Sequence, residues 1–170
     1  MGCVFCEMIE GATLDIKLLN PKAVAPSKRK EDSGYDVYGI FEEGSSLYLG
    51  QGENAIISTG IAMQIPQGLG FAIKNRSSNG IKGAIVGAEL VDSGYRGEVH
   101  IDIHNISNKT IVITDSPKDI CDEDVTILNS KDALIQGVII PTLDLPVRIR
   151  EELDPSEREE GKFGSTNKTK

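Results

Sequence analysis

The sequence is short of several residue types, and each shortage narrows the possible functions. Its 170 residues include no tryptophan, three cysteines and two histidines. Three cysteines fit no disulfide framework, which predicts a reducing, cytoplasmic environment. Acidic residues outnumber basic residues by 26 to 18, and the net charge of −8 excludes a general nucleic-acid surface, which would be basic. No apolar run approaches the length of a membrane span and the first residues do not resemble a signal peptide, so we expect no membrane association.

The composition and the pattern of the sequence are typical of one globular domain that consists mainly of β-strands. Apolar residues make up 39% of the chain, which is enough for a buried core. Short β-branched runs alternate with Gly, Pro, Asn and Asp, whereas sustained helical periodicity is missing. This pattern predicts an antiparallel sandwich or jelly roll. The candidate strands are residues 55–65, 69–73, 99–105, 110–114 and 137–141.

The candidate strand 99–105 alternates strictly between apolar and polar residues. The two faces carry Val99, Ile101 and Ile103 on one side, and His100, Asp102 and His104 on the other. If copies of the chain met at a symmetry axis, the polar face could gather a metal ion or an anion there. The alternative is a solvated or hydrogen-bonded face, which is the commoner arrangement.

Three segments differ in composition from the expected β domain at 13–150. Residues 1–12 form an N-terminal extension. Residues 115–128 begin with an acidic stretch and are expected to be an insertion between two strands. Residues 151–170 are charged and poor in apolar side chains, which predicts a flexible C-terminal arm.

Short motifs follow one another along the chain in a particular order. They are Ser-Gly-Tyr-Asp-Val-Tyr at 33–38, Asn-Arg-Ser-Ser at 75–78, Val-Asp-Ser-Gly-Tyr-Arg-Gly-Glu at 91–98, Ala-Leu-Ile-Gln-Gly at 133–137, and Gly-Lys-Phe-Gly-Ser-Thr at 161–166. From about residue 14 to about residue 167 the ordered set resembles the trimeric, all-β dUTPase family. The resemblance implies a distorted antiparallel jelly roll and a homotrimer with active sites shared between subunits. It also implies Mg²⁺-dependent hydrolysis of dUTP to dUMP and pyrophosphate.

The third motif carries the candidate catalytic residue, Asp92. Hydrolysis of a phosphoanhydride needs an aligned and partly deprotonated water, and a carboxylate on a stiff hairpin can provide both. In the resembling family the matching Asp is the proposed general base, and the residue matching Tyr95 packs beneath the deoxyribose and excludes a 2′-hydroxyl. The plainer interpretation is an ordinary hairpin turn, because Asp, Ser and Gly are turn residues.

The resemblance assigns recognition of the uracil base to the segment that precedes Asp92. Its candidate residues are Val86, Glu89, Leu90 and Val91. Glu89 stands where the family typically has glycine, which would allow close approach of the backbone to the base. A Glu side chain there either points away from the base or narrows the pocket.

Phosphate and metal binding are assigned to the first, second and fourth motifs. A guanidinium and two hydroxyls on a turn suit phosphate oxygens, which makes Arg76, Ser77 and Ser78 candidates. Gln136 matches a phosphate-contacting glutamine of the family. Asp36 matches an Asp that holds Mg²⁺ through water, although it could equally cap backbone amides in a turn.

The last motif is expected to close over the bound nucleotide. Phe163 would stack on the uracil, and Gly164 would contribute its amide. Arg158, Ser165 and Thr166 would hold the terminal phosphates. A flexible arm that folds over its ligand excludes water and completes the site.

Two alternatives to a dUTP hydrolase stay open. The first is a dCTP deaminase of the same fold, which needs a catalytic Glu near the base. The second is a dUTP-binding regulatory protein with weak turnover, whose protein partner would contact the insertion at 115–128. The fragment around Cys3 and Cys6 resembles the start of histidine-triad hydrolases, but the required His-x-His-x-His cluster is missing. With Cys121 as the only further cysteine, a zinc site there lacks ligands.

Overall fold

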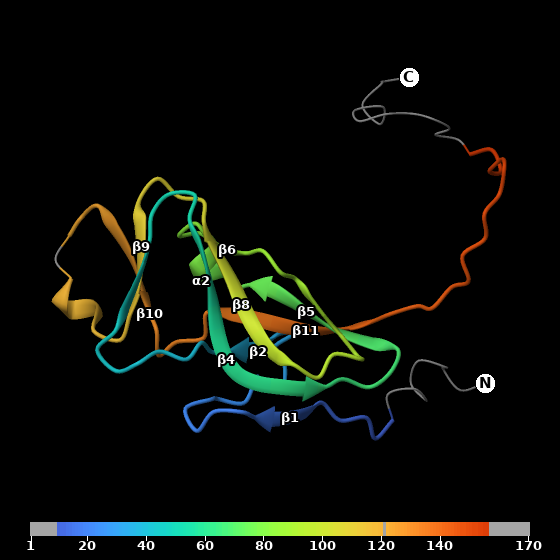
Figure 1. The fold of residues 1–170 in the computed structure, drawn as a ribbon, viewed down its shortest axis with the longest axis horizontal. Coiled ribbons are helices and arrows are strands. Elements are labelled where there is room, and N and C mark those ends of the chain that lie inside the picture. Colours follow the sequence, from blue (N-terminus) through green and yellow to red (C-terminus); the bar gives the residue numbers. More distant parts are fainter. Residues whose placement is uncertain (1–9, 121, 157–170) are drawn as a thin grey trace.

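A computed structural model of the protein describes residues 10–120 and 122–156. Nearly all regular structure in this part of the chain is strand (Figure 1). The strands are β1 (Asp15–Leu18), β2 (Tyr35–Val37), β3 (Ser46–Leu49), β4 (Asn54–Gln64), β5 (Leu69–Asn75), β6 (Ala84–Val86), β7 (Leu90–Asp92), β8 (Glu98–Asn105), β9 (Thr110–Thr114), β10 (Val125–Asn129) and β11 (Ile135–Pro141). The described helices are the single turns α2 (Ser77–Gly80) and η1 (Pro117–Asp119), and no described helix is long and apolar enough to cross a membrane.

The strands form three small sheets. Their strand orders are β1-β4-β8-β6, β10-β9-β3 and β2-β11-β5-β7. All neighbouring strands run antiparallel except β9 and β10, which run parallel. The expectation of an all-β, mainly antiparallel fold is confirmed.

The core lies between the apolar faces of these sheets. The alternation predicted for strand 99–105 is confirmed, because Val99, Ile101 and Ile103 of β8 are buried while the polar residues between them lie on the opposite face. On β11, Gly137 lies against the buried ring of Phe71, and a Cβ at position 137 would come within 1.8 Å of that ring. Only glycine permits such close packing of β11 against β5.

A bulge in β4 determines how β8 begins. Gly60 adopts a φ of +64°, and the register with β8 shifts between Ser58 and Ala62. The bulge turns the Gly60 amide toward the first residue of β8, and Glu98 accepts a hydrogen bond from it at 2.8 Å. The hydroxyl of Ser58 donates to the same carboxylate. This side chain therefore ties the start of β8 to β4.

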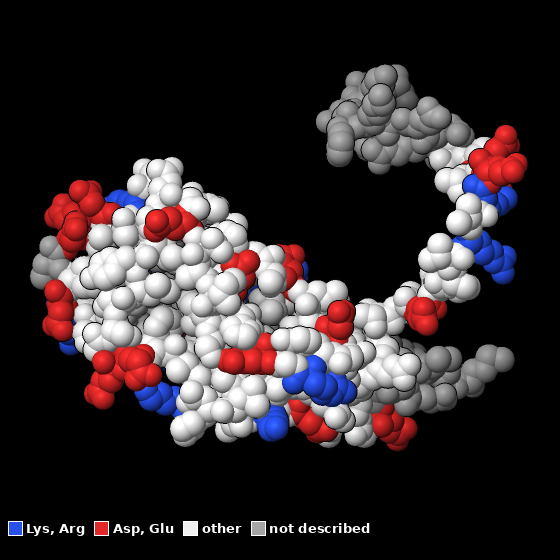
Figure 2. Space-filling model, in the orientation of Figure 1, with Lys and Arg blue, Asp and Glu red and all other residues white. Residues whose placement is uncertain are grey.

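Residues 115–128 contain both a loop and a strand. Pro117–Asp119 forms η1, whereas residues 125–128 belong to β10, where Leu128 is buried against the core. Figure 2 shows several Asp and Glu side chains at the end of the molecule formed by β9 and β10. Whether the segment is an insertion stays a prediction.

The chain leaves the body of the fold after β11. Residues 142–156 form no strand, and they extend away from the three sheets (Figure 1). Apolar side chains at every second position are mostly or fully exposed along this segment: Leu143, Leu145, Val147 and Ile149. The alternation is that of a strand with one apolar face, yet no described residue covers that face.

Candidate functional site

The first, second and fourth motifs converge on one polar pocket of about 360 Å³. The pairing of β2 with β11 places Asp36 opposite Gln136. Strand β5 ends beside them, and α2 begins immediately after Arg76. Side chains predicted to bind phosphate or metal therefore lie together on three elements: Asp36, Arg76, Ser77, Ser78 and Gln136.

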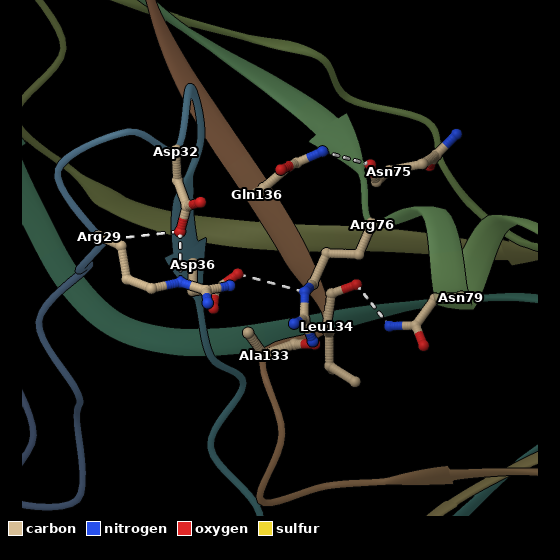
Figure 3. Close-up of polar contacts among 9 residues, drawn as sticks. All are labelled: Arg29, Asp32, Asp36, Asn75, Arg76, Asn79, Ala133, Leu134 and Gln136. Carbon is tan, nitrogen blue, oxygen red and sulfur yellow. Dashed lines mark hydrogen bonds and ion pairs between the residues drawn. The ribbon is translucent and has the colours of Figure 1, made fainter.

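Arg76 is held in place from two sides (Figure 3). Its Nε lies 3.2 Å from Oδ1 of Asp36, and its Nη1 donates to the carbonyl of Ala133 at 2.7 Å. Gln136 donates from Nε2 to the carbonyl of Asn75 at 2.9 Å, so its Oε1 is the end that is free to face the pocket. These contacts fix a guanidinium and a side-chain amide before any ligand arrives, which suits recognition of phosphate oxygens.

The third motif lines a separate pocket of about 250 Å³. Strand β7 pairs with β5, whereas β8 belongs to another sheet, so the two arms on either side of the Asp92–Tyr95 turn are parted. The Tyr95 amide donates to the carbonyl of Asp92 at 3.1 Å and closes this turn. Leu90 and Val91, both predicted to contact the base, line the same pocket with Asp92 and Tyr95.

Two residues that follow this turn, Gly97 and Glu98, position the Tyr95 ring, and neither was singled out from the sequence. The Tyr95 hydroxyl donates to the carbonyl of Glu98 at 2.9 Å. The ring lies over Gly97, where a Cβ would come within 2.4 Å of the hydroxyl oxygen. The only signal in the sequence is the Gly-Glu pair that ends the motif. Gly97 acts because it has no side chain, and Glu98 acts through its backbone carbonyl. Neither property can be inferred from the residue type alone.

Glu98 is also the residue of this pocket with a perturbed carboxyl group. The Ser58 hydroxyl and, after it, the Gly60 amide donate to this carboxylate and hold its pKa below the usual range. His100 adds a smaller effect in the same direction, and its Nε2 lies 3.8 Å from Oε2 of Glu98. Glu98 is therefore ionised, and its carboxylate is hydrogen-bonded to Ser58 and Gly60 of β4. Asp92 is the exposed carboxylate of the pocket.

Glu89 and Val86, which were predicted to contact the base, do not line this pocket. The Glu89 side chain lies beside Lys74, with 3.7 Å between Oε2 and Nζ, and its carbonyl accepts from the Ile73 amide at 2.7 Å. The Glu in place of a family glycine is therefore directed along β5. Val86 is buried in β6.

Several predicted residues lie outside the described part of the chain. They are the arm residues Arg158, Phe163, Gly164, Ser165 and Thr166, together with Cys3, Cys6 and Cys121. Among the described residues, no group of three or more His, Cys, Asp or Glu side chains could hold a metal ion. The polar pocket and the pocket at Asp92 share no lining residue.

An all-β fold, a polar pocket lined by arginine, serine and aspartate side chains, and a second pocket between parted strands fit a phosphate-binding protein. Comparisons with known proteins identify the family. The dUTPase family model matches residues 20–118. The deoxyuridine 5′-triphosphate nucleotidohydrolase of Nautilia profundicola is 31% identical over 159 residues, which cover 91% of this chain and 99% of the relative. The enzyme of the same name from Candida albicans is 33% identical over 160 residues, covering 92% and 89%.

Solved structures agree with this assignment. A mutant dUTPase of Staphylococcus bacteriophage 80alpha, solved with dUpNHpp, has a TM-score of 0.72 and 26% identity, and the match covers 91% of this chain and 98% of that one. A mutant dUTPase of the S. aureus phage phi11, whose structure details the coordination of a structural Mg(II) ion, has a TM-score of 0.66 and 26% identity, covering 85% and 100%. The chain belongs to the dUTPase family.

Proposed function

We propose that Asp92 and a Mg²⁺ ion support the hydrolysis of dUTP to dUMP and pyrophosphate, the reaction of the family to which this chain belongs. The observation that carries the proposal is the convergence of Asp36, Arg76 and Gln136 from separate motifs on one pocket. In a protein of net charge −8, such a pocket has to concentrate its cation and donors locally to bind a polyphosphate.

The polar pocket is proposed to bind the triphosphate. Arg76 supplies a planar guanidinium, and Ser77 and Ser78 supply hydroxyl donors at the start of α2. Charge builds up on the phosphate oxygens as the bond to the leaving pyrophosphate breaks. Donors that are already fixed stabilise that charge without reorganisation.

Asp36 is the residue proposed to hold Mg²⁺, through water. Mg²⁺ keeps several waters and binds through one or two carboxylates plus phosphate oxygens, so the partly exposed Asp36 carboxylate in a phosphate pocket fits this ion. Asp32, the other carboxylate that lines the pocket, is paired with Arg29. When bound, the ion neutralises charge on the phosphates. Asp36 also forms an ion pair with Arg76, with 3.2 Å between Oδ1 and Nε, which holds the carboxylate beside the guanidinium in the pocket.

In the second pocket, Asp92 is proposed to take the proton of the attacking water. The oxygen of that water bonds to the α-phosphorus, the bond from the α-phosphorus to the bridging oxygen breaks, and pyrophosphate leaves with the bonding electrons. Tyr95 would lie against the deoxyribose, and the free backbone groups of the parted strand would pair with the uracil edge. Cytosine would leave such groups unpaired, which is costly in a closed site.

The complete site is proposed to form between subunits of a homotrimer. Support comes from the separation of the two pockets, which share no lining residue within one chain. Further support comes from the exposed apolar side chains of residues 143–149, which would be buried by packing on a neighbouring subunit. The arm at 151–170 would then close over a site built by other chains.

The cytoplasmic location predicted from the cysteine content is part of this proposal.

Pyrophosphate release from dUTP, dCTP, dTTP and UTP, with and without Mg²⁺, tests the activity. We expect fast, Mg²⁺-dependent release from dUTP alone, and loss of nearly all turnover in Asp92→Asn with nucleotide binding retained. Ammonia release from dCTP would favour the deaminase alternative, and dUTP binding without turnover would favour the regulatory one. Unchanged turnover in Asp92→Asn would remove that residue from the mechanism.

Mixed oligomers test whether the site is shared. Asp92→Asn and Arg76→Ala should each be inactive alone. Refolding the two together creates interfaces that combine an intact Asp92 from one chain with an intact Arg76 from another, so activity should return. Inactive mixtures, with subunit exchange verified by mass, would place both residues in a site within one chain.

A further inference from the structure

Arg29 is a cation of the polar pocket that belongs to none of the five motifs. It lies in the basic loop 28–30 that leads to β2, and it lines the pocket together with Arg76 and Gln136. In Figure 3 its side chain reaches past Asp32 toward the side of the pocket where Asp36 and Arg76 meet. The pocket therefore contains two guanidinium groups that approach from different elements.

The two arginines differ in how firmly they are held. Arg76 forms an ion pair with Asp36 and a hydrogen bond to the Ala133 carbonyl, and its side chain is 31% exposed. Arg29 is 91% exposed and, among the described residues, its guanidinium has one partner: Nε lies 3.0 Å from Oδ2 of Asp32. Its terminal nitrogens are thus free for a ligand.

Asp32 is the exposed ion-pair partner of Arg29. The side chain and then the amide of Arg29 donate to this carboxylate and hold its pKa below the usual range. Exposed ion pairs of this kind contribute little stability, because water solvates both charges. A polyphosphate, with several negative charges, can therefore draw the guanidinium away from Asp32 at little cost.

We propose that Arg29 binds the β- and γ-phosphates of the nucleotide, and hence the pyrophosphate product. This inference rests on the proposed function, and it adds a pyrophosphate-specific contact to it. Arg76 lies deep in the pocket beside the metal-binding candidate Asp36, whereas the exposed Arg29 is placed for the end of the phosphate chain that is nearest solvent. A guanidinium fork matches the paired oxygens of a terminal phosphate.

The neighbouring lysines provide a matched control. Lys28 is already engaged, because its Nζ donates to the Asp32 carbonyl at 2.7 Å and lies 5.4 Å from the centre of the Tyr35 ring. Lys30 carries the same charge on the same loop but does not line the pocket. Lys30→Ala therefore measures the effect of lowering the net positive charge of the loop without removing the proposed contact.

The test is calorimetric titration of the full-length protein with inorganic pyrophosphate and Mg²⁺. Arg29→Ala should weaken pyrophosphate binding by about three- to tenfold, as expected for an exposed charged contact. Arg29→Lys should fall between this variant and the wild type, and Lys30→Ala should change the affinity by less than about twofold. The affinity for dUMP, which lacks the β- and γ-phosphates, should be the same in all four proteins.

Asp32→Asn gives an independent readout of the exchange. It removes the competing charge, so it should tighten pyrophosphate binding, and the gain should shrink in the Arg29→Ala background. Equal weakening in Arg29→Ala and Lys30→Ala, or an equal loss of dUMP affinity, would overturn the inference. A wild-type protein without turnover would count against the proposed function alone, whereas one that binds no pyrophosphate would overturn the inference itself.

Discussion

Replacing Gly97 with alanine should weaken the selection of deoxyribose over ribose. The added Cβ would lie 2.4 Å from the hydroxyl oxygen of Tyr95, 2.6 Å from Cζ and 3.0 Å from Cε2. Carbon atoms do not approach one another this closely, so the ring has to move. The backbone at Gly97 lies outside the left-handed region and accepts alanine, and Tyr95 is 45% exposed, so the ring can turn toward solvent without unfolding the protein.

The size of the effect follows from what the displaced ring loses. The hydrogen bond from Tyr95 to the Glu98 carbonyl, 2.9 Å long, is worth about 1 kcal/mol when its donor can reach water. A free-energy difference of about 1.4 kcal/mol corresponds to a factor of ten. Loss of about 1 kcal/mol from the positioning of the ring should therefore reduce the ratio of kcat/KM for dUTP over UTP by about fivefold. Global stability should change by less than about 0.5 kcal/mol, as for other surface substitutions.

The assay is pyrophosphate release from dUTP and from UTP at limiting substrate, with Gly94→Ala as the control. Gly94 lies in the same turn, a Cβ there would meet no atom within 4 Å, and its φ is also outside the left-handed region. Gly94→Ala should therefore keep the wild-type ratio. An unchanged ratio in Gly97→Ala, or an equal fall in both variants, would refute the view that Gly97 seats the ring that reads the sugar.

Further predictions concern the phosphate pocket, the β4 bulge and the arm. Arg76→Lys keeps the charge but loses the fork, so kcat/KM for dUTP should fall about 10- to 100-fold. Thermal stability should fall slightly as well, because the carbonyl of the buried Ala133 loses the hydrogen bond from Nη1. The lowered pKa of Glu98 stabilises the fold fully above the unfolded pKa of about 4.3, and that contribution is lost as pH falls through the lower folded pKa. The free energy of unfolding in urea should thus be lower for Glu98→Gln than for the wild type at pH 7, and the two values should converge in acid. A difference that stays constant with pH would contradict this. Deleting residues 157–170 should leave a folded protein with poor turnover, and full activity would show that the arm is no lid.

The long strands could be predicted because they are runs of apolar or alternating residues, with one buried face on β8 and two buried faces over most of β5 and β9. Residues 99–105 and 110–114 match β8 and β9 closely, β4 is shifted by one residue from the candidate 55–65, and β5 and β11 each extend their candidate strands by two residues. Strands of three or four residues, such as β2 and β7, have too few side chains for a period to be visible. They form because a longer strand offers them a partner: β11 pairs with β2, and β5 pairs with β7.

Site residues could be predicted where the side chain itself carries the functional group. They could not be predicted where the role depends on the position of a residue in the fold. Asp36, Arg76 and Gln136 were assigned through the resemblance of their motifs to the dUTPase family, with chemistry that suits phosphate or metal, before the structure showed them in one pocket. Gly97 acts through the space it leaves empty. Arg29 looks like any solvated cation in a charged loop until the fold brings that loop to the pocket.

The separation of Asp92 from Arg76 has a physical reason of its own. A guanidinium beside a carboxylate favours the ionised form and makes it a weaker base, and Arg76 already lies 3.2 Å from Asp36. Had Asp92 lain in the same pocket, the two would form such a pair in the free protein. In the proposed trimer, Asp92 would meet the charged phosphates only when nucleotide and subunits come together, because the two pockets share no lining residue within one chain. Assembly would then control when Asp92 can act on a water, which agrees with the trimer as the proposed catalytic unit.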